Sequence, residues 1–380
     1  GGSGADTLWL HGLADLGGWA VLPLTQLQIE GNDPGGTVGG GDVVSVRELG
    51  VGVPRALDFA YSGSGDVLLT GLAMPVDIRT AEVVEYLGGS GNDDTLSVTG
   101  TAADDLITVA PLSGDAARVF LGGDPWDGPA ADGDFFDQFP GVAGGGAGPD
   151  LHIAGAANLY VDAAGGSSNR LYIYAPSEDN LTDGASVIVP GLGSGNAYDE
   201  ISVTDSSVTI NNNSLGALLP ITFDSAALVQ AIPTDRGLVV NAGFEATPDA
   251  AGLADQIYAM PSSLFAIMVN GGDPVPAFAP NGDRLDIGGW GDVDIWADKN
   301  GTVSVAISGV GTFPVDFSSI ENLAFWVWGA VNIYGDNNDP GVDQNDLFEI
   351  VGTGYHSFAL SINGNTPIQF FGVSDLNIFG

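Results

Sequence analysis

Acidic and amide side chains gathered in Gly-rich turns are the residues of this chain with the clearest chemistry. Carboxylate, amide and backbone carbonyl oxygens are the ligands that calcium takes, about six to eight at a time. Residues 333–353 read IYGDNNDPGVDQNDLFEIVGT, and residues 88–94 read GGSGNDD. The candidate calcium ligands are Asp6, Asn92, Asp93, Asp94, Asp104, Asp105, Asp336, Asn338, Asp339, Asp343 and Asp346. We expect calcium at some of these turns. The alternative is that Asp and Asn only form tight turns and cap strand ends.

The charge of the chain supports a need for cations and excludes several classes of partner. Among 380 residues, 48 are acidic and 8 are basic, which gives a net charge of -40. Such a charge opposes folding by self-repulsion unless cations screen it. Because a basic footprint is missing, the chain is not expected to bind nucleic acid or to insert into an anionic membrane. The absence of Cys excludes disulfides and thiolate chemistry.

Residues suited to catalysis are sparse. The three histidines, His11, His152 and His356, lie far apart in the sequence and lack metal-ligand spacing. The arginines are scattered, and among so many acids no pair is singled out as glycosidase carboxylates. We therefore predict that the protein is not an enzyme.

Tryptophan side chains are candidates for contact with a sugar ring or with another subunit. In AFWVW, residues 324–328, alternation places Phe325 and Val327 on one face of a strand and Trp326 and Trp328 on the other. We expect the first pair to be buried and take Trp326 and Trp328 as candidate binding residues, together with Trp126.

Short strands in imperfect repeats must position these side chains. Runs such as LSVTG, LYIYA and ISVTD alternate with period two, and Gly, Asn, Asp and Pro clusters separate them. Residues 306–323 resemble residues 359–376 at an offset of 53. This pattern predicts an all-β fold, a β-solenoid with degenerate units of about 50 residues. Tandem β-sandwich domains are the alternative.

The predicted organisation has three parts. Residues 1–120 and 151–380 form one continuing repeat region, and residues 121–150 form an insertion rich in Gly, Asp, Pro and aromatic residues. The last residues, joined to the first, regenerate the Gly-rich turn, which indicates a segment of a longer array.

The stretch GGSGNDDTLSVTGTAADDLITV, residues 88–109, resembles repeats of giant secreted proteins of bacteria, of the planctomycete type GGxGxDTLxVxGT. Residues 356–378 are similar to the second half of those repeats. The turn itself is distantly similar to that of the RTX calcium-binding β-roll proteins, although here the turns stand about 50 residues apart rather than in tandem. The resemblance implies a secreted, repetitive surface protein and no particular activity.

Together these features predict an extracellular structural or adhesive protein. It would be part of a fibre, sheath or giant cell-surface protein, calcium-stabilised at its acidic turns. Its partners would be copies of itself or flanking repeats, with surface glycan as a further candidate. The alternative function is a glycan-binding module or a carbohydrate-active β-helix enzyme.

Overall fold

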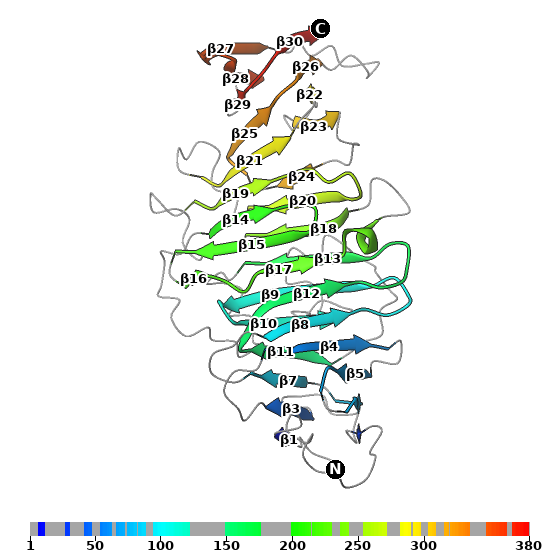
Figure 1. Cartoon of the computed structure of the whole chain (residues 1–380). Coiled ribbons are helices and arrows are strands. Elements are labelled where there is room, and N and C mark those ends of the chain that lie inside the picture. The colour runs from blue at the N-terminus through cyan, green and yellow to red at the C-terminus, as the bar shows by residue number, and fades with distance from the viewer. Residues whose placement is uncertain are drawn as a thin grey trace, which may run out of the picture.

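The computed structural model describes strands and tight turns that succeed one another from the N-terminal to the C-terminal end of an elongated molecule (Figure 1). The described residues are 7–11, 27–30, 42–47, 54–62, 66–72, 74–81, 83–88, 94–121, 149–175, 199–213, 215–229, 236–242, 254–271, 282–289, 292–297, 303–308, 315–318, 320–334, 347–362 and 367–379. The fold is all-β with large multi-stranded sheets, as the alternating sequence pattern predicts.

The first sheet, sheet A, has ten strands. In spatial order they are β1 (Thr7–His11), β3 (Val43–Arg47), β7 (Val83–Leu87), β11 (Asp150–Ala154), β10 (Ala116–Leu121), β9 (Leu106–Ser113), β13 (Arg170–Tyr174), β18 (Arg236–Asn241), β20 (Ala266–Asn270) and β24 (Val315–Ser318).

The second sheet, sheet B, has sixteen strands. In spatial order they are β2 (Leu27–Glu30), β6 (Val76–Arg79), β5 (Val67–Thr70), β4 (Ala56–Tyr61), β8 (Asp94–Thr99), β12 (Ala156–Asp162), β17 (Ile221–Phe223), β15 (Ser207–Asn212), β14 (Asp199–Val203), β19 (Gln256–Ala259), β21 (Arg284–Gly289), β25 (Asn322–Val327), β29 (Ile368–Phe371), β28 (Ser357–Ile362) and β27 (Phe348–Gly354), with β16 (Gly216–Ala217) paired to β15.

The third sheet, sheet C, lies towards the C-terminal end and has four strands (Figure 1). They are β23 (Val303–Ser308), β22 (Asp292–Ala297), β26 (Ala330–Tyr334) and β30 (Asp375–Phe379). A short 3-10 helix, Ser225–Leu228, follows β17, and the Asp224 side chain caps it by accepting from the Ala226 N–H.

The path of the chain alternates between sheets, and most neighbours within a sheet are parallel. From β18 to β21, successive strands belong to sheets A, B, A and B, and β18 pairs with β20 as β19 pairs with β21. Antiparallel neighbours are local additions to these ladders, as in β4–β5–β6, β9–β10–β11 and β27–β28–β29. The predicted insertion joins β10 to β11, and apart from its ends it lies outside the described residues.

The pairing register does not follow the sequence repeat. Leu323 and Leu376, which match at the offset of 53, lie in β25 of sheet B and β30 of sheet C. Leu376 instead pairs with Val331, 45 residues earlier. Parallel partners elsewhere are separated by 28 residues, at Ile257 and Leu285, or by 67, at Leu171 and Leu238. Connections of different length thus join strands that stack in register.

Alternating side chains from the sheets form one continuous apolar core. Strand β8 shows the pattern, since Leu96 and Val98 are fully buried while Ser97 and Thr99 face outward. On the outward side of sheet A, Tyr172, Val239 and Met268 form a second buried cluster. The outward side of sheet B differs, because it carries mainly polar, partly exposed side chains.

Candidate functional site

The acidic residues predicted at the turn before β8 act as hydrogen-bond acceptors where the structure describes them. Asp94 accepts from the Arg55 backbone N–H at 2.9 Å and from the Tyr86 hydroxyl at 2.5 Å. Burial is the main cause that raises the pKa of Tyr86, and the hydrogen bond to Asp94 raises this pKa further. Asp94 therefore joins β8 to β4 and to a core tyrosine of sheet A.

The next two candidates, Asp104 and Asp105, organise the turn that leads into β9. Asp105 is fully buried and accepts from the Thr101 N–H at 2.6 Å and the Thr101 hydroxyl at 2.8 Å. Burial raises its pKa, against the effect of these bonds. Asp104 Oδ1 accepts from the backbone N–H groups of Ser167 and Ser168, which lie 63 and 64 residues later, just before β13.

The remaining candidate ligands and one candidate binding residue lie outside the described residues. They are Asp6, Asn92, Asp93, Asp336, Asn338, Asp339, Asp343, Asp346 and Trp126. In the described part of the chain, no three His, Asp or Glu side chains are grouped so as to hold a metal ion. Calcium at the acidic turns therefore stays a prediction.

Buried or half-buried acids also recur where strands of sheet B begin. Asp255 accepts from the Asp199 N–H at 2.7 Å, and Asp283 accepts in turn from the Asp255 N–H at 2.8 Å. Glu321 continues the series by accepting from the Asp283 N–H at 2.9 Å. We call Asp94, Asp199, Asp255, Asp283 and Glu321 the corner carboxylates. Four of them satisfy an N–H that the neighbouring strand leaves free at its start.

A short sequence pattern marks these corners, and the repeat at the offset of 53 does not reveal it. Each corner carboxylate is followed two residues later by an inward Leu or Ile, in DTL, DEI, DQI, DRL and ENL. The acid makes the corner and the aliphatic residue enters the core, so the pattern has a direct physical origin.

Asp199 is the corner carboxylate with the largest resolved change in proton affinity. It is 2% exposed, and burial raises its pKa to about 7, although the Asn212 side-chain amide donates to its Oδ1 at 2.9 Å. A carboxyl deprived of water resists ionisation unless charges or donors replace that water.

A groove of about 610 Å³ crosses the outward side of sheet B. Its walls come from the β14–β15 hairpin and β16, which are close in sequence, and from β19 and β21, which follow about 50 and 80 residues later. Its outward side chains include Glu200, Ser202, Thr209, Asn211, Gln256, Tyr258 and Asp286. Asn211 donates to Glu200 Oε2 at 3.1 Å.

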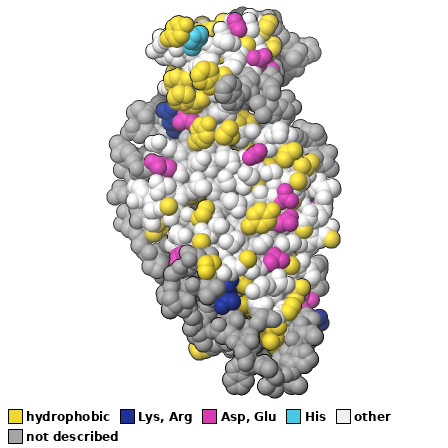
Figure 2. Space-filling view, in the orientation of Figure 1, with side chains coloured by type: hydrophobic (Ala, Val, Ile, Leu, Met, Phe, Trp, Pro, Cys, Tyr) yellow, Lys and Arg dark blue, Asp and Glu magenta, His cyan; other side chains and the backbone are white. Residues whose placement is uncertain are grey.

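Aromatic side chains continue this surface towards the C-terminal end. Phe325 and Val327 are fully buried whereas Trp326 is 47% and Trp328 67% exposed, which confirms the predicted alternation. Trp326 stacks on Phe371 of β29 with ring centroids 4.4 Å apart. Its indole N–H donates to Asp286 Oδ1 at 3.3 Å, so the stack adjoins the groove. Figure 2 shows hydrophobic side chains gathered over this part of the visible surface.

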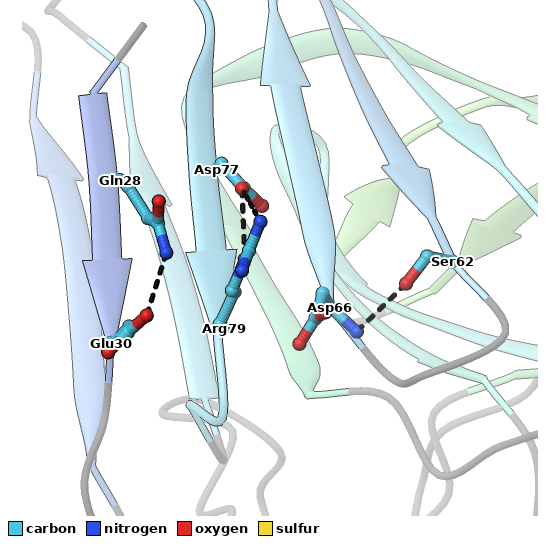
Figure 3. Close-up of polar contacts among 6 residues, drawn as sticks. All are labelled: Gln28, Glu30, Ser62, Asp66, Asp77 and Arg79. Atoms are coloured by element: carbon cyan, nitrogen blue, oxygen red, sulfur yellow. Dashed lines mark hydrogen bonds and ion pairs between the residues drawn. The ribbon is translucent and has the colours of Figure 1, made fainter.

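The opposite end of the same face carries small polar pairs (Figure 3). Arg79 donates to Asp77 at 2.6 Å and 2.9 Å, and the Gln28 amide donates to Glu30 at 2.7 Å. Ser62 accepts from the Asp66 N–H at 3.3 Å. These contacts are between residues two or four positions apart in the sequence.

The histidines with described side chains stay apart. His152 lies on β11, and burial lowers its pKa to about 4, with Arg118 adding to the effect. His356 adopts a positive φ of 56° between β27 and β28, and its Nδ1 lies 2.8 Å from the Val373 carbonyl oxygen. His11 lies in β1.

Comparisons with known proteins provide no family for this chain. It matches no protein-family model, and no curated protein or solved structure has significant similarity to it. Within the described residues, no helix has the length and apolar character needed to cross a membrane.

Proposed function

We propose that this protein is an extracellular β-solenoid with a structural or adhesive role, associating end to end with copies of itself or with flanking repeats. One observation carries the proposal. The chain alternates between sheets A and B, and most strands pair in parallel with the strand that the chain placed in the same sheet before. A chain that coils in this way buries its apolar faces rung against rung. Length can then grow by adding rungs without changing the cross-section.

The last strand of sheet C supports association at the C-terminal end. Leu376 and Ile378 pair with Val331 and Ile333, which are fully buried, yet they are themselves 38% and 49% exposed. Within the described residues, β30 pairs with β26 alone. Its free edge and open apolar row match what another strand would cover.

The first strand of sheet A offers a corresponding surface. Leu8 pairs with the buried Val44 and is 43% exposed. Trp9, 57% exposed, lies beneath the Arg47 guanidinium at 4.7 Å. A strand edge with apolar side chains at each end suits end-to-end stacking, while the net charge of -40 opposes non-specific aggregation.

Sedimentation velocity over a range of concentrations tests the association. The wild-type chain is expected to form elongated oligomers as concentration rises, and the double variant Leu376→Asp/Ile378→Asp is expected to stay monomeric. Leu68→Asp is the matched control, since Leu68 is also 38% exposed but lies on β5. A wild-type chain that remains monomeric throughout would contradict the association.

Calcium at the acidic turns is part of the same proposal. Removal of calcium with EGTA is expected to lower the unfolding temperature and shorten any oligomers, and calcium but not magnesium should restore both. Unchanged stability and length in EGTA would leave the acids as turn-forming and charge-bearing residues only.

A further inference from the structure

We propose that the groove on the outward side of sheet B, with the adjoining aromatic side chains, binds a neutral polysaccharide in an extended conformation. The proposed site runs from Glu200 and Gln256 through Tyr258 to Trp326 and Phe371. Such binding would give the proposed adhesive role a ligand, and it does not depend on end-to-end association of the chains.

The aromatic side chains supply apolar surfaces of the kind that pack on sugar rings. A pyranose ring presents C–H groups on its faces and hydroxyls around its rim, so it combines an apolar face with a polar edge. Tyr258 is 40% and Trp326 47% exposed, and the Trp326–Phe371 stack fixes the indole in place. Rigid exposed rings bury area with little loss of conformational entropy.

The polar side chains beside these rings suit hydroxyl groups. Gln256 and Asn211 have amides that both donate and accept, Ser202 and Thr209 have hydroxyls, and Glu200 accepts only. Alternating donors and acceptors are what vicinal sugar hydroxyls require. A purely apolar peptide segment would leave these groups without partners, at a cost in free energy.

Charge selects against an acidic ligand. Asp286, the acid next to Trp326, is paired with Arg284 through contacts of 2.8 Å and 3.0 Å. Glu200 has no such cation among its described contacts, and the chain as a whole carries -40. A polyuronate would be repelled, whereas an uncharged polymer meets no electrostatic barrier.

The arrangement of the site along the sheet favours a polymer over a single sugar. Tyr258, Asp286, Trp326 and Phe371 lie on β19, β21, β25 and β29, which are four successive strands. Three strand spacings of about 4.8 Å span roughly 14 Å. The site therefore follows the long axis of the molecule and accommodates several linked rings.

Gly288 gives Tyr258 its position. A Cβ built at residue 288 would collide with the Tyr258 hydroxyl, so the ring of Tyr258 reaches across β21 only because this residue has no side chain. Gly288 pairs with Trp326, which places the Tyr258 hydroxyl beside the aromatic stack. The substitution Gly288→Ala is therefore expected to displace Tyr258 without removing any group that contacts sugar.

Affinity electrophoresis of the whole chain in gels containing hydroxyethyl cellulose, xyloglucan or galactomannan tests the proposal. Retardation by at least one of these neutral polymers is expected, with none by polygalacturonate. Tyr258→Ala and Trp326→Ala should each weaken binding by about tenfold or more. Gly288→Ala should weaken it less, and Leu68→Ala, on the same sheet but outside the groove, should bind as the wild type does.

Circular dichroism and unfolding temperature check that each variant is folded. If Trp326→Ala does not fold, a folded Tyr258→Ala or Gly288→Ala variant is sufficient to test the binding site. Absence of retardation by all three neutral polymers overturns the proposal. Binding only to polygalacturonate or to polylysine, the basic-peptide probe, also overturns it. The double variant Leu376→Asp/Ile378→Asp should keep full affinity, which separates this site from the proposed association.

Discussion

The corners where strands of sheet B begin and the outward side of the same sheet both carry acidic residues, but in opposite environments. At the corners, Asp94, Asp199 and Asp255 are at most 4% exposed and bond to backbone or core groups. On the outward side, Asp77 and Asp286 pair with arginines two residues away and meet solvent. The net charge of -40 therefore combines acids that hold the fold together with acids that face water. Substitutions in the two groups should separate these roles.

The largest effect is expected from the pH dependence of Asp199. Its folded-state pKa of about 7 exceeds the unfolded value of 3.8, so the folded chain binds more protons between pH 4 and pH 7. The contribution of Asp199 to stability should therefore fall as pH rises through this window, by roughly 3 kcal/mol at its upper end.

Asp199→Asn removes this titration while keeping the shape of the side chain. Urea unfolding at pH 4.5 and pH 7.5 should show a much smaller difference in the variant. A residual slope should persist, because burial raises the pKa of Asp150 to about 6 and lowers the pKa of His152 to about 4, and these two shifts change stability in opposite directions as pH rises. Equal slopes in the two proteins would show that Asp199 ionises normally.

The second effect is loss of a corner acceptor. Asp255→Ala leaves the Asp199 N–H unpaired in a buried corner, which should lower the free energy of unfolding by about 1–3 kcal/mol. Asp255→Asn retains an acceptor oxygen and should cost less. Chemical denaturation at pH 7 measures both, and an alanine variant as stable as the asparagine variant would contradict the capping role.

A smaller effect is expected on the outward side, at Thr209 in the wall of the groove. Thr209→Asp adds a charge at an exposed position, so stability should change by no more than about 0.5 kcal/mol. Denaturation curves should almost overlap those of the wild type. A loss as large as that of Asp255→Ala would remove the distinction between the two regions.

The smallest effect belongs to the Arg79–Asp77 pair. Both side chains lie at the surface of β6, where solvent and salt weaken their attraction. Asp77→Asn should unfold at the same denaturant concentration as the wild type in 0.15 M salt. A clear shift that disappears in 1 M salt would mean that this ion pair contributes more than its exposure implies.

Local sequence patterns predicted the strands and which residues point inward. Alternation alone separates Phe325 and Val327 from Trp326 and Trp328, because a strand places successive side chains on opposite sides. The capping alternative for Asp in the turns also describes Asp94 and Asp105 as they are found.

Pairing between distant strands could not be predicted in the same way. The repeat offset of 53 records similarity between segments, whereas the stacking of Val331 on Leu376 depends on how much chain the intervening turns and hairpins consume. The groove was unpredictable for the same reason. Tyr258 and Glu200 become neighbours only once β14 and β19 are known to pair.

The hydrogen bonds of the corner carboxylates have a direction that bears on how this protein is made. In each of the four bonds that accept a backbone N–H from an earlier strand start, the acceptor belongs to the later segment, as when Asp283 receives the N–H of Asp255. During synthesis, the backbone N–H of an earlier corner therefore has no such carboxylate acceptor until the next corner carboxylate has been added. Each of these corners is therefore completed only when the next strand of the series has been added. Unfolding should run in the reverse order, beginning at the strand of this series that is synthesised last.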